Sequence, residues 1–225
     1  MTTGQVSVHF IFPANVSRER ARACLTHEEK VRAGLFRFPQ DAIHWVACRA
    51  SLRNILGHAI QLPPHEVPLV LSEFEKPLLA PPYDRLHFNL SHSPRLALVA
   101  VSQESPVGID LESLDRATDL LECEATFCHA EEISALPIER VARASHLLRI
   151  WTAKEAVLKS LGTGLHHPPD GIRIRFQDPC GMAMSDSPLI GIEDQRLYEL
   201  EHPALAGYRA MLSASTTAVE IEMIC

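Results

Sequence analysis

The chain has 225 residues, a length that suits one large domain or two small ones. Hydrophobic residues make up 46% and charged residues 22% of the chain, which excludes a mainly disordered protein. The net charge of −7 gives no general basic field for nucleic acid, so an anionic ligand must be held by a local basic cluster.

The first half of the chain is predicted to alternate strands and helices. The N-terminus lacks the basic start, apolar core and cleavage site of a secretory signal. Asp41 is a candidate helix cap, and Gly57 with the Pro63-Pro64 pair marks the end of that helix. The expected elements are a strand at 6–12, a helix at 18–25, a basic stretch at 30–37, a helix at 42–56, a strand at 67–71, a proline-rich loop at 72–85, and two strands, 86–90 and 96–101, joined by a turn at 91–94.

The second half repeats this order. Gly162 and Gly164 end its long helix, and the Pro168-Pro169 pair stops it. No apolar run approaches the roughly 20 residues of a membrane helix. The expected elements are a strand at 107–111, a helix at 140–161 and strands at 172–176, 198–201 and 208–214.

Landmarks of the two halves match at a nearly constant offset. Trp45 and Trp151 are 106 positions apart, and Gly57 and Gly162 are 105 apart, as are the Pro-Pro pairs and the strands after them. Internal duplication is one explanation, and chance or a common supersecondary motif is the other. With a duplication, we expect an α+β fold of two similar subdomains with the ligand site in the cleft between them.

Residues 107–112, VGIDLE, carry two carboxylates on one predicted strand. Residues i and i+2 of a strand point to the same side, so Asp110 and Glu112 share a face while Ile109 and Leu111 face the core. Adjacent carboxylates repel each other unless a cation lies between them, and such oxygen ligands suit Mg²⁺. The alternative is a solvated strand face with ordinary acidic residues.

The helical sequence WTAKEAVLK, residues 151–159, adds a third carboxylate. Glu155 and Lys159 are four residues apart and share a helix face, an arrangement that is also typical of a plain surface ion pair. In the functional interpretation, Glu155 lies beside the metal, and Lys154 and Lys159 hold phosphate.

The segment FNLSHSP, residues 88–94, offers hydroxyls and an imidazole. The G-x-S-x-G elbow is missing, and adjacent residues of a strand point to opposite faces, so a Ser91–His92 catalytic pair is poorly supported. A phosphate-binding turn and a plain hairpin turn remain as interpretations.

The cysteines form neither a CxxC pair nor a disulfide framework. Reduced thiols in a cytosolic protein are therefore expected. The six residues are Cys24, Cys48, Cys123, Cys128, Cys180 and Cys225.

In this order and spacing, FNLSHS, GIDLE and WTAKEAVLKSLGTGL resemble the motifs of the 4′-phosphopantetheinyl transferases. The length and the apparent duplication are similar to the surfactin-synthetase-activator type, the two-subdomain, monomeric branch. The resemblance implies two similar α/β subdomains, 1–104 and 105–225, related by pseudo-two-fold symmetry. The active site would lie in the cleft between them.

The resemblance also implies an activity, a holo-carrier-protein synthase. Such an enzyme binds coenzyme A and Mg²⁺, or Mn²⁺, and moves the phosphopantetheine arm to a serine of an apo acyl, polyketide or peptidyl carrier protein. The other product is 3′,5′-ADP. The expected protein is a cytoplasmic monomer whose partners are coenzyme A and the apo carrier, with neither nucleic acid nor membrane.

The family motifs imply three sets of site residues in this chain. Glu155 and Lys154 would be catalytic, and Asp110, Glu112 and Glu155 would be metal ligands. Coenzyme A would be bound by Lys76, Pro77, Ser91, His92, Asp110, Lys154 and Lys159.

The chain departs from the family pattern at the nucleotide end of coenzyme A. The family commonly has an arginine where this chain has His44, and Arg49 or Arg53 is a candidate substitute. The residue before Lys76 is often glycine in the family and is Glu75 here. Lys30 and Arg32 are further candidates for contact with the 3′-phosphate.

Two other functions stay open. One is a non-catalytic coenzyme A-binding regulatory protein, which the presence of all three carboxylates argues against. The other is a Ser–His esterase, which the missing elbow argues against. The sequence does not identify the carrier, and the resemblance implies that residues 114–136 contact it.

Overall fold

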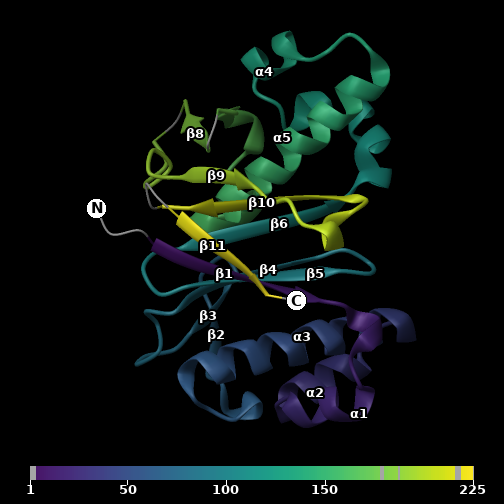
Figure 1. The fold of residues 1–225 in the computed structure, drawn as a ribbon, viewed down its shortest axis with the longest axis vertical. Coiled ribbons are helices and arrows are strands. Elements are labelled where there is room, and N and C mark those ends of the chain that lie inside the picture. Colours follow the sequence, from purple (N-terminus) through teal and green to yellow (C-terminus); the bar gives the residue numbers. More distant parts are fainter. Residues whose placement is uncertain (1–3, 178–179, 187, 216–218, 225) are drawn as a thin grey trace.

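A computed structural model describes residues 4–177, 180–186, 188–215 and 219–224. The chain forms a mixed α+β structure in two halves, each built around a sheet and a 22-residue helix (Figure 1). No helix of the described ranges is long and apolar enough to cross a membrane. The helices are α1 (Arg18–Cys24), α2 (His27–Gly34), α3 (Pro39–Ile60), α4 (Ala130–Ala135) and α5 (Arg140–Leu161), and the strands are β1 (Gly4–Ile11), β2 (Leu69–Leu71), β3 (Pro77–Leu79), β4 (His87–His92), β5 (Ala97–Ser102), β6 (Val107–Ser113), β7 (Ile172–Arg175), β8 (Gly181–Ser185), β9 (Arg196–Glu199), β10 (Tyr208–Ala214) and β11 (Val219–Ile224).

The strands form two main sheets and a small hairpin. The first sheet has the order β11-β1-β5-β4, the second has the order β6-β10-β9-β8-β7, and β2 pairs with β3. The late strand β11 runs parallel to β1, with Ile221 opposite Val6. A strand from the end of the chain therefore completes the sheet of the first half, while the predicted division after residue 104 stays a prediction.

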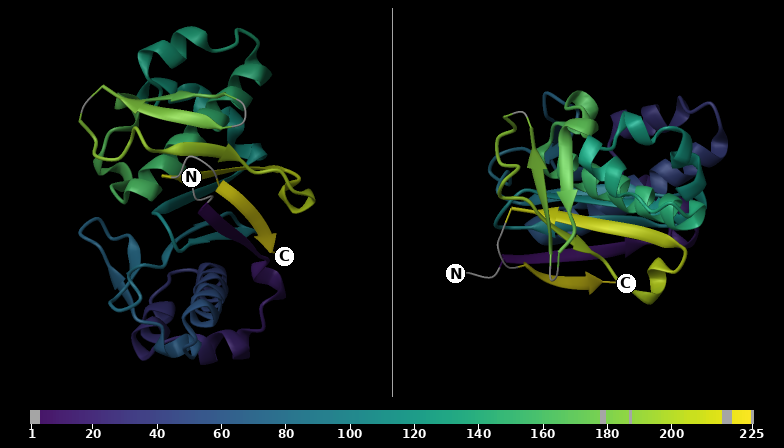
Figure 2. Two further views of the ribbon diagram at one scale, coloured as in Figure 1. Left: turned by 60° about the vertical axis from the view of Figure 1, so that its left-hand side comes forward. Right: turned by 90° about the horizontal axis from the view of Figure 1, so that it is seen from above.

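Each long helix covers one face of one sheet, and the two remaining faces share a core. Leu56 of α3 packs in one cluster with Val99 of β5, and Val157 of α5 packs in another with Met211 of β10. The shared cluster contains apolar residues from β1 and β5 as well as from β6 and β10. Figure 2 shows α5 along one side of the second sheet. The two halves are therefore joined by apolar packing.

Strand β6 alternates between this shared core and α5. Ile109 and Leu111 are buried in the core, as predicted. Gly108 faces α5, where an added Cβ would lie 2.0 Å from the carbonyl oxygen of Ala156 and 2.3 Å from the amide nitrogen of Ser160. Only a glycine allows the two backbones to approach this closely.

The structure confirms the helix at 140–161 and corrects three predicted boundaries. Helix α3 begins at Pro39, so Asp41 lies in its first turn and does not cap it. Helix α3 does not end at Gly57 but continues to Ile60. Gln61, whose φ is 58°, is its C-cap. Gly57 instead makes room for the returning chain, because a Cβ there would lie 2.6 Å from the carbonyl oxygen of Leu62. The predicted turn at 91–94 begins too early, because β4 stays paired with β5 as far as His92.

Several elements lie where no regular structure was predicted. Helix α2 occupies most of the basic stretch, and its N-terminus is held by a capping box between Thr26 and Glu29. The predicted loop at 72–85 contains β3, and β8 and β11 were not predicted. Glu75, in the turn between β2 and β3, has a φ of 61°, a conformation that favours glycine. Cys225 lies outside the described residues, and the other five cysteines are free.

We expect Gly108→Ala to destabilise the protein by about 3 kcal/mol or more. The added methyl group would overlap backbone atoms of α5, which can move only if the helix separates from β6. Urea denaturation measures the change. Gly34→Ala, at a helical position with no atom within 4 Å, is the matched control and should be neutral or slightly stabilising. An unchanged free energy of unfolding for Gly108→Ala would contradict the close packing.

Candidate active site

The candidate site lies where the β4 edge of the first sheet meets the β6 edge of the second. Two side chains of β4 accept hydrogen bonds from backbone amides of β6. Asn89 Oδ1 accepts from the amide of Ile109 at 2.9 Å, and Ser91 Oγ accepts from the amide of Leu111 at 3.1 Å. Both side chains are buried and share one face of β4. These two hydrogen bonds align β4 with β6, so that Ser91 lies beside Asp110.

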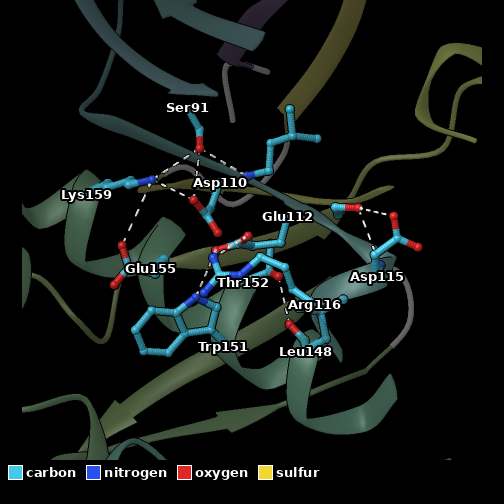
Figure 3. A network of polar contacts seen from close by, with 12 residues as sticks. Ser91, Asp110, Glu112, Asp115, Arg116, Leu148, Trp151, Thr152, Glu155 and Lys159 are labelled. Atoms are coloured by element: carbon cyan, nitrogen blue, oxygen red, sulfur yellow. Dashed lines mark hydrogen bonds and ion pairs between the residues drawn. The ribbon is translucent and has the colours of Figure 1, made fainter. Parts of the chain in front are cut away.

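Asp110 is the most deeply buried carboxylate of the site, with 3% of the residue exposed. Its Oδ1 accepts a hydrogen bond from Ser91 Oγ at 2.9 Å and lies 2.5 Å from Lys159 Nζ (Figure 3). Its Oδ2 is also buried and has no hydrogen-bond partner among the described residues. A buried carboxylate oxygen without a partner is costly, and a bound cation or donor would satisfy it.

Glu155 joins this group from the adjacent turn of α5. Lys159 Nζ lies 4.0 Å from a Glu155 carboxylate oxygen, so the predicted shared face is present. Burial raises the pKa of the Glu155 carboxyl; Lys159 opposes this shift, and the nearby Asp110 and Glu112 add to it. The three carboxylates therefore act on one another electrostatically.

Glu112 completes the group but is already engaged. Trp151 Nε1 donates to Glu112 Oε1 at 3.1 Å. The Nη1 atom of Arg116, in the 3₁₀ segment η3 (Leu114–Glu122), donates to both carboxylate oxygens, at 3.0 and 2.9 Å. Figure 3 shows these carboxylates together with Lys159 and Arg116, the two cations that contact them.

The donor set fits a hard divalent cation. Three carboxylates, one with an unpartnered buried oxygen, are ligands that Mg²⁺ prefers. In the part of the chain that the structure describes, no three His, Cys, Asp or Glu side chains are grouped so that they could hold one ion. Asp110 and Glu155 are paired with Lys159, and Glu112 is paired with Arg116.

A cavity of about 330 Å³ lies between α3, β3 and β4. This is the size range of small-ligand pockets. The cavity lining includes Asn89 and His92 of β4, which lie on either side of Ser91, the hydrogen-bond donor to Asp110. The ring of His92, at the end of β4, lies 5.1 Å from that of His44, and burial lowers the pKa of both imidazoles. The lining residues are Phe36, Asp41, His44, Trp45, Cys48, Arg49, Leu52, Pro77, Phe88, Asn89, Leu90 and His92.

Lys76 binds the end of α5. Its Nζ donates to the carbonyl oxygens of Lys159, Ser160 and Val107 at 2.6, 3.3 and 3.3 Å, and burial lowers its pKa to about 8. The last carbonyls of a helix have no partners within it, so a cation stabilises them. The neighbouring Pro77 does line the cavity. The predicted role of Lys76 in nucleotide binding stays a prediction.

Lys154 is enclosed by contacts of its own, and its predicted roles in phosphate binding and in catalysis stay predictions. The residue is fully buried, and its Nζ contacts Glu132 at 2.6 Å and the carbonyls of Phe127 and Pro169 at 2.7 and 3.0 Å. Successive helix residues are rotated by about 100°, so Lys154 cannot share the face of Glu155. Lys154 thus ties α5 to α4 and to the backbone at Phe127 and Pro169.

The residues predicted to contact the nucleotide end of coenzyme A fall into two groups, those that line the cavity and those that do not. Arg53 is buried, and it contacts Glu29 and the carbonyls of Pro64 and Val67, so it does not reach the cavity. Arg49 and His44 line the cavity. The guanidinium groups of Arg32 and Arg49 lie 5.4 and 5.5 Å from the Trp45 ring centroid. Lys30 lines a separate groove between α1, α2 and α3.

Three residues of the site were missed by the sequence analysis. Trp151 precedes Glu155 by four residues, and that spacing was a usable signal for a shared helix face. Asn89 precedes Ser91 by two, which places it on the same face of β4. Arg116 gave no signal, because the strand ends between it and Glu112.

Comparison with known proteins supports one family. The profile described as 4′-phosphopantetheinyl transferase superfamily matches residues 106–210, and the profile described as 4′-phosphopantetheinyl transferase, N-terminal, matches residues 13–104. The 4′-phosphopantetheinyl transferase HetI of Nostoc sp. is 37% identical over 148 residues, which cover 64% of this chain and 62% of HetI. The chain thus spans about three fifths of that relative.

Two further matches are more distant. The 4′-phosphopantetheinyl transferase Sfp of Bacillus subtilis is 26% identical over 158 residues, covering 70% of this chain and 69% of Sfp. The solved structure of Thermotoga maritima holo-[acyl-carrier-protein] synthase aligns with 48% of this chain and 61% of that chain, with a TM-score of 0.39 and 19% identity.

We expect Lys154→Met to destabilise the protein by about 3–5 kcal/mol, because it leaves the Glu132 charge buried without its partner. Chemical denaturation measures the loss. The double variant Lys154→Met/Glu132→Gln removes that charge and keeps an oxygen that can accept the Ile174 amide. It should therefore be more stable than Lys154→Met alone, and the opposite order would contradict the ion-pair interpretation.

Proposed function

We propose that this chain, which belongs to the 4′-phosphopantetheinyl transferase superfamily, moves the phosphopantetheine arm of coenzyme A to a serine of an apo carrier protein. The observation that carries the proposal is the cluster of Asp110, Glu112 and Glu155 with Lys159 at the junction of the two halves. Attack on a pyrophosphate depends mainly on positioning and on charge, and this cluster supplies both. The second product is 3′,5′-ADP.

The carboxylates and the lysine have separate roles in this proposal. Asp110, Glu112 and Glu155 would hold Mg²⁺ or Mn²⁺, and such a cation would offset the charge on the leaving ADP oxygen. Lys159 contacts Asp110 at 2.5 Å, and a cation on Asp110 would free its ammonium for a phosphate oxygen. Ser91 is hydrogen-bonded to the same carboxylate oxygen, so its hydroxyl faces the same region.

Glu155 is the best candidate for the base. Asp110 accepts a hydrogen bond from Ser91, and Glu112 accepts from Trp151 and Arg116. In the described part of the chain, the Glu155 carboxylate contacts Lys159 Nζ at 4.0 Å. Glu155 is therefore the least engaged of the three carboxylates, and it can take the proton of the carrier serine directly or through a water molecule.

The cavity is suited to the rest of coenzyme A. Trp45 and Phe36 offer aromatic faces, and His44, Arg49 and His92 offer donors to phosphate. We assign the nucleotide end of coenzyme A to this cavity, with His44 and Arg49 in place of the family arginine and Arg53 as a structural residue. The carrier would be an acyl, polyketide or peptidyl carrier that docks on residues 114–136.

The molecular context completes the proposal. We propose a cytoplasmic monomer with subdomains 1–104 and 105–225. Its active site would lie between the subdomains, where β4 meets β6.

We expect an apo acyl carrier protein to gain the mass of one phosphopantetheine when it is incubated with this protein, coenzyme A and Mg²⁺. Intact-mass analysis measures the gain, which EDTA should abolish. Asp110→Asn should lose activity while its circular dichroism spectrum stays unchanged, because one buried ligand is gone. No gain with carriers of several pathways, despite coenzyme A binding, would favour a non-catalytic coenzyme A-binding protein.

We expect Glu155→Gln to lower the turnover number by about 10²-fold or more and to leave the Michaelis constant for coenzyme A within a few-fold. The amide keeps the shape of the side chain but cannot accept the serine proton. Steady-state kinetics with a carrier protein measure both constants. Glu104→Gln, on the exposed loop after β5, is the control. An unchanged turnover number in Glu155→Gln would exclude this residue as base and ligand.

A further inference from the structure

Glu112 differs from the other two carboxylates in how it is held. The Arg116 guanidinium nitrogen Nη1 contacts both of its oxygens, and the Trp151 indole N–H contacts one of them. Asp110, by contrast, keeps one buried oxygen without a partner, and Glu155 has its recorded contact at 4.0 Å. All three carboxylates are thus paired with a cation of the protein, Asp110 and Glu155 with Lys159 and Glu112 with Arg116. Glu112 differs because both of its oxygens are engaged, whereas Asp110 keeps one free of hydrogen bonds.

Arg116 and a metal ion compete for the same atoms. A divalent cation and a guanidinium repel each other, so they cannot both lie against one carboxylate without a loss of affinity. In the described part of the chain, no three acidic, histidine or cysteine side chains are grouped around one point. The ion pair with Arg116 is one physical reason why Glu112 is not grouped with the other carboxylates, because it holds the Glu112 side chain toward η3.

The two contacts of Glu112 differ in how easily they break. The Arg116 side chain is 54% exposed, and exposed ion pairs are weak because water and salt screen them. Trp151 is packed edge-on against the buried Phe127, with ring centroids 5.3 Å apart. The Arg116 side chain can therefore move into solvent. The Trp151 ring stays in place, and only its hydrogen bond to Glu112 changes.

We propose that Arg116 is a positioning residue that holds Glu112 away from the metal, and that ion binding to the carboxylates displaces it. Glu112 becomes a ligand only when the guanidinium leaves. The inference takes only the position of the metal from the proposed function. It does not require the transfer reaction to occur.

The first test is Mn²⁺ binding, followed by electron paramagnetic resonance of the free ion at low ionic strength. Arg116→Ala should bind Mn²⁺ at least about 3-fold more tightly than the wild type, because no competing cation remains. Arg116→Lys should fall between them, since the ammonium keeps the positive charge but is more strongly hydrated than a guanidinium. Arg149→Ala is the matched control, because it removes one positive charge and one half-exposed ion pair, with Glu199, at a distance from Glu112.

The second test follows Trp151 by fluorescence in a Trp45→Phe background, where it is the remaining tryptophan. Mg²⁺ should change its emission, because Glu112 changes its contact with the indole N–H. In Trp45→Phe/Arg116→Ala the midpoint of this change should move to a lower Mg²⁺ concentration. A purely structural role for Arg116 would leave the midpoint unmoved.

The outcomes separate this inference from the proposed function. Equal or weaker Mn²⁺ binding in Arg116→Ala than in Arg149→Ala would overturn the role of Arg116 and leave the transferase proposal intact. No Mn²⁺ binding to the wild type at all would overturn both this inference and the metal site. A carrier protein that gains no phosphopantetheine, together with tighter Mn²⁺ binding in Arg116→Ala, would overturn the transferase proposal alone.

Discussion

The site depends on the close approach of β6 to α5. Gly108 carries no side chain, so the backbone of β6 lies against the backbone of α5 at Ala156 and Ser160. Asp110 follows two residues later on the same face of the strand, and this places its carboxylate against Lys159 and near Glu155. A side chain at position 108 would move the helix outward and separate these groups. One missing Cβ thus sets the geometry of the charged cluster.

Polar side chains then fix the two halves to each other at this point. Asn89 and Ser91 accept hydrogen bonds from the backbone of β6, and Lys76 donates to the last carbonyls of α5. These groups are buried or half-buried, and each would cost free energy if it lost its partner. The halves therefore have little freedom to shift where they meet. The apolar cluster that they share extends the same constraint to the rest of the sheets.

Two lysines of α5 show how position decides the role of a charge. Lys154 makes a closed set of contacts with Glu132 and two carbonyls, and it holds α4 and two loop segments against α5. Lys159 reaches Asp110 and Glu155 with part of its side chain exposed, so it can change partners. The first is a structural ion pair, and the second is part of the charge balance that a phosphate or a metal ion would alter.

Much of the site was present in the spacing of the residues. The bounds of α5, the burial of Ile109 and Leu111, and the shared face of Glu155 and Lys159 all follow from helix and strand periodicity, which is a local property of the backbone. The order of the three motifs was sufficient to indicate the family. The sequence alone therefore predicted the strand and the helix on which the three carboxylates lie.

Only the tertiary structure decided which partners the other charged groups have. Lys154 and Lys76 bind carbonyls, and Arg53 binds a carboxylate and carbonyls, all from segments remote in the chain. Ser91 and His92 of the predicted turn are strand because β5 pairs with them, and Gly57 lies inside α3, where it leaves room for the returning chain. The physical reason is the same in each case. A buried polar group takes whatever donor or acceptor the fold brings to it, and no periodicity in the sequence records where that partner comes from.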